Sequence, residues 1–170
     1  VIFCEGFGLR TNPFFNFLPL SGTKGELLVI RAPEYREQRV IKSGVFTIPL
    51  GEDRYLVGAT YNRKDQSPEP TAESREELLE KVRKFLLCDF TVEGQRAGIR
   101  PTVPDRRPLV GAHPEHKGLY VLNGMGSRGV LIAPFAAHAL SRLIRKGEPL
   151  PEAMDCGRFS GRYEKLRHKS

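Results

Sequence analysis

A glycine-rich turn near residue 125 has residue types and a spacing that could do chemistry. It reads Gly124-Met125-Gly126-Ser127-Arg128-Gly129 and separates a strand expected at 118–123 from a helix expected at about 130–146. Small residues let the backbone approach a ligand closely, and the first turn of a helix offers unpaired N–H groups with a partial positive charge. Such a turn suits an anionic or electron-rich ligand, although it could equally serve packing alone. We interpret it as distinct from the fingerprint that binds dinucleotides.

The elements that position this turn are expected to be short strands and two helices. Strand-like stretches alternate with turn signals in the first sixty residues, at 26–31, 39–42, 45–49 and 55–60. Their close spacing predicts antiparallel hairpins. Further strands are expected at about 91–100 and 107–111, before the strand that leads into the glycine turn.

The first helix is expected after a proline-containing loop at 65–71. Ser74 with Glu77 three residues later has the pattern of a capping box, which predicts a helix from Ser74 to about Cys88. Its apolar residues recur at the 3.6-residue period, so one face should be buried. The second helix, at about 130–146, has a similar apolar stripe, with Pro134 a little beyond its first turn and Gly147 as a stop signal.

The composition is that of an ordinary globular protein. Hydrophobic residues make up 39% of the 170, and no apolar run reaches the roughly 18 to 20 residues that a membrane span requires. The first residues lack the pattern of a signal peptide, so we expect a cytoplasmic protein without a membrane partner. Much of the formal net charge of +7 lies in the last fifteen residues, which predicts a solvated basic tail at 148–170.

The cysteines and histidines show no pattern of a disulfide framework or a metal site. Buried or incidental thiols are expected for the three widely spaced cysteines, Cys4, Cys88 and Cys156. Surface or helix positions are expected for the four histidines, His113, His116, His138 and His168.

The sequence begins abruptly with an apolar run. Residues 1–4 are strand-like and are followed at once by Glu5-Gly6-Phe7-Gly8. A run of this kind is typical of the interior of a parallel sheet. We therefore expect a truncated or processed chain.

The C-terminal third resembles a known family of flavoproteins. The stretch from Ala97 to Gly111, the strand at 118–123 and the glycine turn with the residues up to Pro134 together resemble the C-terminal signature of the D-amino-acid oxidase superfamily. Glycine and sarcosine oxidases are the nearer relatives within it. The turn at 126–129 is also similar to that in the oxidase half of the bifunctional enzyme that modifies the wobble uridine of tRNA. Looser similarity extends to residues 1–6, 19–30 and 46–61.

The resemblance implies an α+β fold built from two parts. An antiparallel-sheet substrate domain is combined with the C-terminal part of an FAD-binding αβ (Rossmann-like) domain. The N-terminal half of that FAD-binding domain would be missing, because the start of this sequence has no glycine motif for the FAD pyrophosphate. The implied divisions are 1–18 for the last part of the FAD-binding domain, 19–95 for the substrate domain, 96–147 for the FAD-contacting segment and 148–170 for the tail.

Site residues also follow from the resemblance. Flavin contacts are implied for the loop Gly124, Met125, Gly126, Ser127, Arg128, Gly129 and Val130. A Cβ at Gly129 should push the flavin edge away or strain the loop. Arg100 matches the position that pairs with the substrate carboxylate, with a structural salt bridge as the alternative. Arg128 is a second candidate for the substrate. Phe46 falls where a pocket tyrosine is found in glycine oxidases, and Tyr61 could line the site or pack in its hairpin.

Three functions are compatible with these observations. The first is an FAD-dependent oxidation of a small amine or amino acid to an imine, with the flavin as hydride acceptor. The second is oxidative tRNA wobble-uridine modification, which makes tRNA a possible partner. The third is a non-catalytic interaction domain that has lost its FAD half. In the first two, this chain alone is expected to be inactive without the missing N-terminal half.

Overall fold

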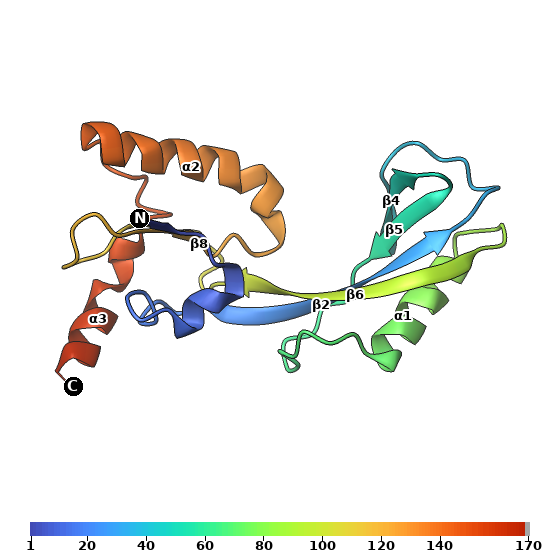
Figure 1. Ribbon diagram of the computed structural model, residues 1–170, viewed down its shortest axis with the longest axis horizontal. Helices are drawn as coiled ribbons and strands as arrows, with labels where there is room; N and C mark the ends of the chain where they lie inside the picture. Colours follow the sequence, from blue (N-terminus) through green and yellow to red (C-terminus); the bar gives the residue numbers. More distant parts are fainter. Residues whose placement is uncertain (169–170) are drawn as a thin grey trace. The chain divides into compact units, whose positions relative to one another are not determined.

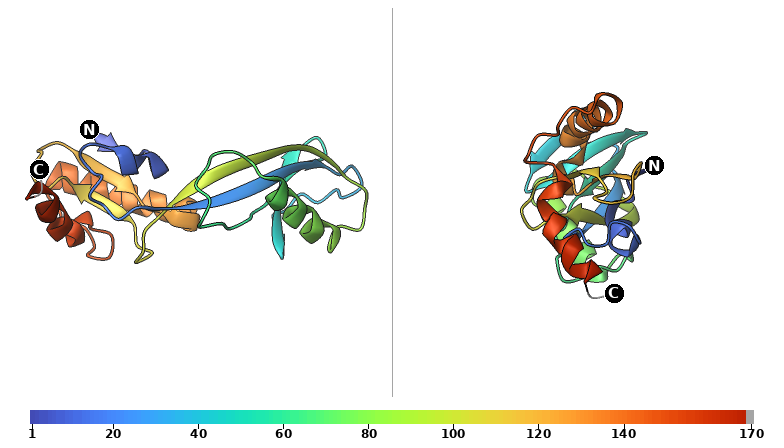
Figure 2. Two further views of the ribbon diagram at one scale, coloured as in Figure 1. Left: turned by 90° about the horizontal axis from the view of Figure 1, so that it is seen from below. Right: turned by 90° about the vertical axis from the view of Figure 1, so that its left-hand side faces the viewer.

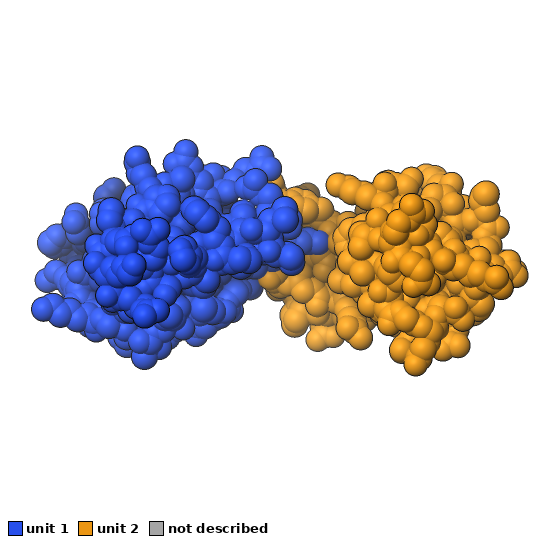
Figure 3. All heavy atoms as spheres, turned by 90° about the horizontal axis from the view of Figure 1, so that it is seen from above, with its two compact units in different colours: residues 1–22, 100–170 blue, residues 23–99 orange. Residues whose placement is uncertain are grey.

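The computed structural model describes residues 1–168 of the chain. They form two compact units (Figure 3), which are described separately below. Unit 2 comprises residues 23–99, and unit 1 comprises residues 1–22 together with the chain from residue 100 onward. The boundaries fall inside two long strands, β2 (Ser21–Arg31) and β6 (Thr91–Thr102). In the described residues, no helix is both long and apolar enough to cross a membrane.

The predicted hairpins form the sheet of unit 2. Its strand order is β3-β4-β5-β2-β6. Besides β2 and β6, its strands are β3 (Ile41–Ser43), β4 (Val45–Gly51) and β5 (Arg54–Gly58). The β3–β4, β4–β5 and β2–β5 pairs are all antiparallel, which confirms the sequence-based expectation.

Helix α1 (Ala72–Arg83) packs on this sheet and completes the core of unit 2. Apolar side chains alternate along the strands, as at Leu28 and Ile30, because successive residues point to opposite faces. They meet the buried stripe of α1, in which Leu78 and Val82 are fully buried. Removing a side chain of this size from such a core costs about 2–5 kcal/mol.

The predicted start and end of α1 are both wrong. Thr71, not Ser74, is the N-cap, with an extended backbone and a side-chain oxygen that accepts a hydrogen bond from the Ser74 N–H at 3.2 Å. The helix ends at Arg83 rather than at Cys88. Thr71 and Ser74 have the same three-residue spacing as Ser74 and Glu77, and the proline at residue 70 favours the earlier boundary.

Unit 1 contains a three-stranded sheet in the order β1-β8-β7. Its strands are β1 (Ile2–Phe3), β7 (Leu109–Ala112) and β8 (Tyr120–Asn123). Strand β1 runs parallel to β8, whereas β7 is antiparallel to it. The predicted N-terminal strand is therefore present with a parallel partner, but among the described residues it lies at the edge of the sheet, not in its interior.

The two faces of the unit 1 sheet are covered by different segments. Helix α2 (Gly129–Lys146) covers one face, where Val110 packs with Leu140 (Figures 1 and 2). The other face is covered by η3 (Cys156–Phe159) and by the aromatic segment at 14–17, which follows η1 (Gly6–Thr11). Leu109 and Val121 point to this second face, so the sheet separates two apolar layers.

The C-terminal segment is folded in part, which corrects the expectation of a solvated tail. Met154 and Cys156 are buried, and helix α3 (Ser160–Arg167) follows. Arg158 forms an ion pair with Asp105 at 2.9 Å. The charge of the tail is therefore partly used to attach it to unit 1.

His113 is buried, so the expectation that all four histidines occupy surface or helix positions is wrong for this residue. It directly follows β7 and packs among aromatic rings of the second layer, including Phe15 and Tyr163. Its Nδ1 accepts the backbone N–H groups of Glu115 and His116 at 3.1 and 3.0 Å. The ring thus closes the turn between β7 and β8.

Candidate functional site

The glycine turn begins where β8 ends, and two of its glycines have backbone conformations that L side chains rarely adopt. Gly124 has φ +71° and Gly126 has φ +58°. Gly124 is also enclosed: a Cβ placed on it would lie 2.7 Å from Val103 Cγ2 and 3.0 Å from Leu109 Cγ. The turn therefore requires glycine at residue 124 for both conformation and space.

Asn123, the last residue of β8, holds the turn in place. Its side chain is buried, and its Oδ1 accepts the Gly124 N–H at 2.7 Å. Its Nδ2 donates to the carbonyl oxygen of Gly6 at 2.9 Å. This residue links the turn to the start of η1, and sequence reasoning missed it. The signal was an asparagine between a strand and a glycine, since asparagine side chains bond local backbone groups.

The start of α2 has no side-chain cap. A short helix, η2 (Gly126–Arg128), leads into it, and neither Met125 nor Arg128 caps the following helix through its side chain. No acidic residue lies in the first turn of α2. The first N–H groups of a helix have no partner within the helix, and they attract negative charge. This start thus has no side-chain acceptor of its own that would compete with an electron-rich ligand edge.

Gly129 differs from the other glycines of the turn. Its φ of −53° and ψ of −44° are ordinary helical values. A Cβ placed on it would lie 3.5 Å from the Cβ of Met125, which is normal van der Waals contact. The expectation that a Cβ at Gly129 strains the loop is therefore wrong, and Gly124 is the position that cannot accept one.

The three glycines of the turn have the G-x-G-x-x-G spacing, yet their context differs from that of a dinucleotide fingerprint. The fingerprint requires a strand, a helix and a second strand parallel to the first. After α2, the described chain makes a single parallel bridge from Asp155 to Val110 of β7. Strand β7 is antiparallel to β8, so the returning chain is antiparallel to β8 as well. The fingerprint also needs an acidic residue after the helix to bind the ribose. Here that residue, Glu148, forms an ion pair with Arg142.

Arg100 lies on β6, two residues before Thr102. The Cγ2 atom of Thr102 is 3.8 Å from the Cβ position of Gly126, so this end of β6 runs beside the glycine turn. Alternate residues of a strand share a face and lie about 7 Å apart. Arg100 is therefore half-buried on the face of β6 that borders the turn.

Arg128 and Ser127 are exposed at the turn. The Arg128 guanidinium donates to the carbonyl oxygen of Arg106 at 3.4 Å, which directs it toward the loop before β7. Met125 and Gly126 are half-buried, whereas the Val130 side chain is 92% exposed.

Phe46 and Tyr61 belong to unit 2. Phe46 on β4 pairs with Gly58 on β5, and its ring edge is 3.1 Å from the Cβ position of that glycine. Tyr61 is 56% exposed, and the Arg63 guanidinium lies over its ring at 5.5 Å. Tyr61 is thus a solvent-facing aromatic ring and not part of the hairpin core.

Comparison with known proteins identifies relatives that match most of the chain. The sequence profile described as FAD dependent oxidoreductase matches residues 1–143. The tRNA 5-methylaminomethyl-2-thiouridine biosynthesis bifunctional protein MnmC of Azoarcus sp. (strain BH72) is 31% identical over 186 aligned positions, which cover 93% of this chain and 29% of that protein. Glycine oxidase of Pseudomonas putida is 29% identical over 136 positions, which cover 78% of this chain and 37% of that protein.

The same kind of protein is found among solved structures. Iminodiacetate oxidase from Chelativorans sp. BNC1 superposes with a TM-score of 0.75 at 26% sequence identity. The superposition covers 88% of this chain and 42% of the oxidase. The chain thus spans less than half the length of each of these three relatives.

Proposed function

The chain belongs to the FAD dependent oxidoreductase family, and we propose that it forms part of an enzyme that oxidises the C–N bond of a small amine or amino acid to an imine. The observation that carries this proposal is the uncapped start of α2 behind a glycine turn that has no room for a side chain at Gly124. Both features lie within the region that matches the family.

The residues of the turn fit a flavin. A planar, electron-rich ring edge needs N–H donors and the absence of side chains in front of them, and the start of α2 supplies both. Residues 124–130 would hold FAD there. When bound, FAD supplies the hydride acceptor of the reaction. The partial positive charge of the helix start favours negative charge at that ring edge, which would tune the affinity of the cofactor for electrons.

For Arg100 we propose a role in binding the substrate carboxylate. A guanidinium grips a carboxylate with two parallel hydrogen bonds and so fixes the orientation of the α-carbon. The position of Arg100 on β6, on the face that borders the turn, supports this role. Arg128 is a second candidate, since it is exposed at the turn. Phe46 and Tyr61 are proposed to contact the substrate because the resemblance extends to them.

We further propose that residues 1–170 alone hold FAD poorly and are inactive. The segment shared with this chain makes up 29%, 37% and 42% of the length of these three relatives. The pyrophosphate of FAD would be bound by an N-terminal half that this segment does not contain. Stoichiometric flavin absorbance in the purified 170-residue chain would overturn this part of the proposal. A cytoplasmic location is proposed as well.

Anaerobic reduction of bound FAD tests the proposed activity. The full-length protein, loaded with FAD, is mixed with glycine, sarcosine, iminodiacetate and simple amines, and loss of the oxidised flavin absorbance is followed. We expect bleaching by at least one of these compounds and a much slower rate in the Arg100→Lys variant, which keeps the charge but loses the planar fork. A flavin that none of these compounds bleaches would overturn the assignment to small amines.

A tRNA-modifying oxidase is the second candidate. It is favoured by the MnmC relative, whose alignment covers 93% of the chain. The formal net charge of +7 is compatible with a polyanionic partner. Bleaching by tRNA carrying a carboxymethylaminomethyl group on its wobble uridine, without bleaching by free amino acids, would identify this second function.

A further inference from the structure

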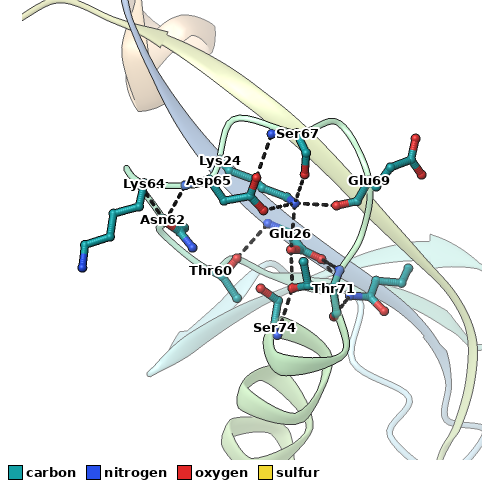
Figure 4. A network of polar contacts seen from close by, with 11 residues as sticks. Lys24, Glu26, Thr60, Asn62, Lys64, Asp65, Ser67, Glu69, Thr71 and Ser74 are labelled. Atoms are coloured by element: carbon teal, nitrogen blue, oxygen red, sulfur yellow. Dashed lines mark hydrogen bonds and ion pairs between the residues drawn. The ribbon is translucent and has the colours of Figure 1, made fainter.

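Strand β2 carries two buried charged residues, Lys24 and Glu26, on one face (Figure 4). Both side chains are 1% exposed, and the Lys24 ammonium lies 3.5 Å from Glu26 Oε1. Burying an ion pair is costly unless all its donors and acceptors are satisfied. Most of the partners that satisfy this pair lie in the segment that connects β5 to α1, and one further partner, Gln95, lies on β6.

The Lys24 ammonium lies at the centre of the loop at 64–69. It donates to Asp65 Oδ2 at 2.5 Å, to Ser67 Oγ at 3.0 Å and to the carbonyl oxygen of Glu69. An ammonium has three N–H donors, and all three are directed to this loop. The oxygens come from alternate residues, so the loop is wrapped around a single cation.

Glu26 binds the C-terminal end of the segment that connects β5 to α1. Its carboxylate accepts the backbone N–H and the hydroxyl of Thr71, both at 2.8 Å, and the Gln95 side-chain amide at 2.8 Å. Thr71 is the N-cap of α1, so the carboxylate also lies at the positive end of that helix.

Backbone hydrogen bonds attach the N-terminal end of this segment to β2. Lys24 and Asn62 exchange N–H to carbonyl bonds of 2.7 and 2.9 Å, and the Thr60 N–H donates to the Glu26 carbonyl oxygen at 3.2 Å. Asn62 Oδ1 then accepts the N–H of Asp65 at 3.1 Å. Tyr61 lies between the two attached residues, and the loop organised by Lys24 begins directly after it.

We propose that Lys24 is a positioning residue: its side chain holds the loop at 64–69 and thereby fixes the Arg63 guanidinium that lies over the Tyr61 ring. The proposal rests on the proposed function, in which Tyr61 contacts the substrate. Without the ammonium, Asp65, Ser67 and Glu69 lose their common partner, and the loop would leave β2. Binding of the amine substrate would then weaken, while the glycine turn of unit 1 would be unaffected.

The charges of this arrangement are stable over a wide range of pH. The hydrogen bond to Asp65 raises the pKa of Lys24, and the same bond lowers the pKa of Asp65 to about 2. Burial alone would raise the pKa of Glu26, but its hydrogen bonds from Thr71 lower it. The ion pairs therefore persist at neutral pH, which suits a permanent support.

Hydrogen exchange tests the loop without any flavin. In the 170-residue chain, Lys24→Ala should increase the exchange rate of the backbone amides at 62–70 by about tenfold or more, because the loop loses its central partner. Lys64→Ala is the matched control: Lys64 belongs to the same loop but is exposed, and its side chain points away from the network in Figure 4. Unchanged exchange in Lys24→Ala would overturn the proposal.

Chemical rescue strengthens this test. Propylammonium can replace the deleted part of the lysine side chain, so it should restore protection of the loop in Lys24→Ala. Tetramethylammonium has the same charge but no N–H donors and should not. Equal rescue by both ions would attribute the effect to ionic strength and would count against a directed ammonium. If Lys24→Ala does not fold, Asp65→Asn and Ser67→Ala remove single loop contacts and should raise exchange at 62–70 to a smaller extent.

Kinetics of the FAD-loaded full-length protein test the positioning role. We expect Asp65→Asn and Lys24→Ala to raise the KM for the amine substrate about tenfold, with a smaller change in kcat and unchanged FAD content, and Lys64→Ala to leave both constants unchanged. A released loop with an unchanged KM would show that Lys24 is only structural. If no amine is oxidised by the unmutated protein, the proposed function fails, and the exchange experiment still decides whether Lys24 builds the loop.

Discussion

Gly124 lies directly against Val103, and a Cβ on the glycine would be 2.7 Å from Cγ2 of the valine. Val103 follows β6, whereas Gly124 follows β8, so this contact joins the strand end near Arg100 to the glycine turn. The same Cβ would lie 3.2 Å from the backbone nitrogen of Leu109. Neighbouring backbone cannot move away as a flexible side chain can, so a substitution at Gly124 must displace the turn itself.

Gly124→Ala is therefore expected to lower the free energy of unfolding by about 1–3 kcal/mol, since it combines a positive φ with a steric overlap. Gly118→Ala is the matched control, because Gly118 has φ +82° but no atom within 4 Å of its Cβ position. The control shows the conformational cost alone. Urea denaturation of both variants measures the difference, and equal losses would show that the overlap at Gly124 is relieved without cost.

The same variant tests the turn as a flavin site. In the FAD-loaded full-length protein, Gly124→Ala should move the helix start away from the ring edge and lower the reduction potential of the flavin. A redox titration measures this shift, with Gly118→Ala as the control. An unchanged potential with intact FAD binding would show that the turn serves packing only.

Arg100→Ala is expected to reduce kcat/KM for a small carboxylate substrate by on the order of a hundredfold, because a charge-assisted pair is lost. FAD content should not change. Arg96→Ala is the control, since Arg96 is an exposed arginine on the same strand. Unchanged kinetics in Arg100→Ala would favour the structural alternative, and steady-state rates with glycine or iminodiacetate decide between the two.

Local sequence patterns predicted the strands and helices that position the glycine turn. They predicted the contacts that hold the turn less well. The hairpins of unit 2 follow from alternation and turn residues, and the position of α2 follows from its apolar stripe and Gly147. The start of α1 was predicted wrongly because Thr71 and Ser74 both have the pattern of an N-cap residue. The Glu26 carboxylate that binds the actual N-cap, Thr71, comes from a strand 45 residues away. Contacts between distant residues leave no local signal.

The Lys24 network illustrates the same limit. A lysine in a strand is expected to be exposed, and its partner Asp65 is 41 residues away in a polar loop. His113 likewise gave no sign of burial, because most of the rings around it, those of Phe15, Phe17 and Tyr163, come from the segment at 14–17 and from α3. At the glycine turn, residue types predicted a turn between β8 and α2, but only backbone angles distinguished Gly124 from Gly129.

Acid should weaken the loop at 64–69 through Asp65. The hydrogen bond from Lys24 lowers its pKa from 3.8 to about 2, so the unfolded chain binds this proton more readily than the folded one. The contribution of the pair is therefore complete above pH 4 and is lost as the pH falls toward 2. The difference in unfolding free energy between the unmutated chain and Asp65→Asn should shrink over this interval, as measured by urea denaturation. A difference independent of pH would contradict the ion pair.

Thiol labelling should distinguish Cys4 from Cys156. Burial raises the pKa of Cys156 to about 12, and its side chain is 3% exposed, so almost no thiolate is accessible. Cys4 is exposed. Iodoacetamide at pH 8 should modify Cys4 in the folded chain and Cys156 only after unfolding, as followed by peptide mass spectrometry. Similar rates at both residues would show that η3 opens readily.

His113 should make the folded chain less stable in mild acid. Burial lowers its pKa below the ordinary 6.5, although the hydrogen bond to the Phe14 carbonyl oxygen acts in the opposite direction. Because Nδ1 accepts two backbone N–H groups, the neutral ring must carry its proton on Nε2, which lies 3.0 Å from that carbonyl oxygen. Adding a proton to Nδ1 would remove both accepted bonds and place a charge among aromatic rings.

The sign of the effect follows from proton binding. Between pH 6.5 and the lowered pKa, the unfolded chain binds a proton at His113 that the folded chain does not, so stability present above pH 6.5 is lost as the pH falls. Urea denaturation at pH 7.5 and pH 5 should show this loss in the unmutated chain and in His138→Gln, whose histidine is exposed on α2. His113→Gln should be less stable overall but lack this pH dependence. A His113 ring that titrates in NMR spectra at or above pH 6.5 would contradict the buried neutral tautomer, because the two N–H donors of the β7–β8 turn would then have to find other acceptors.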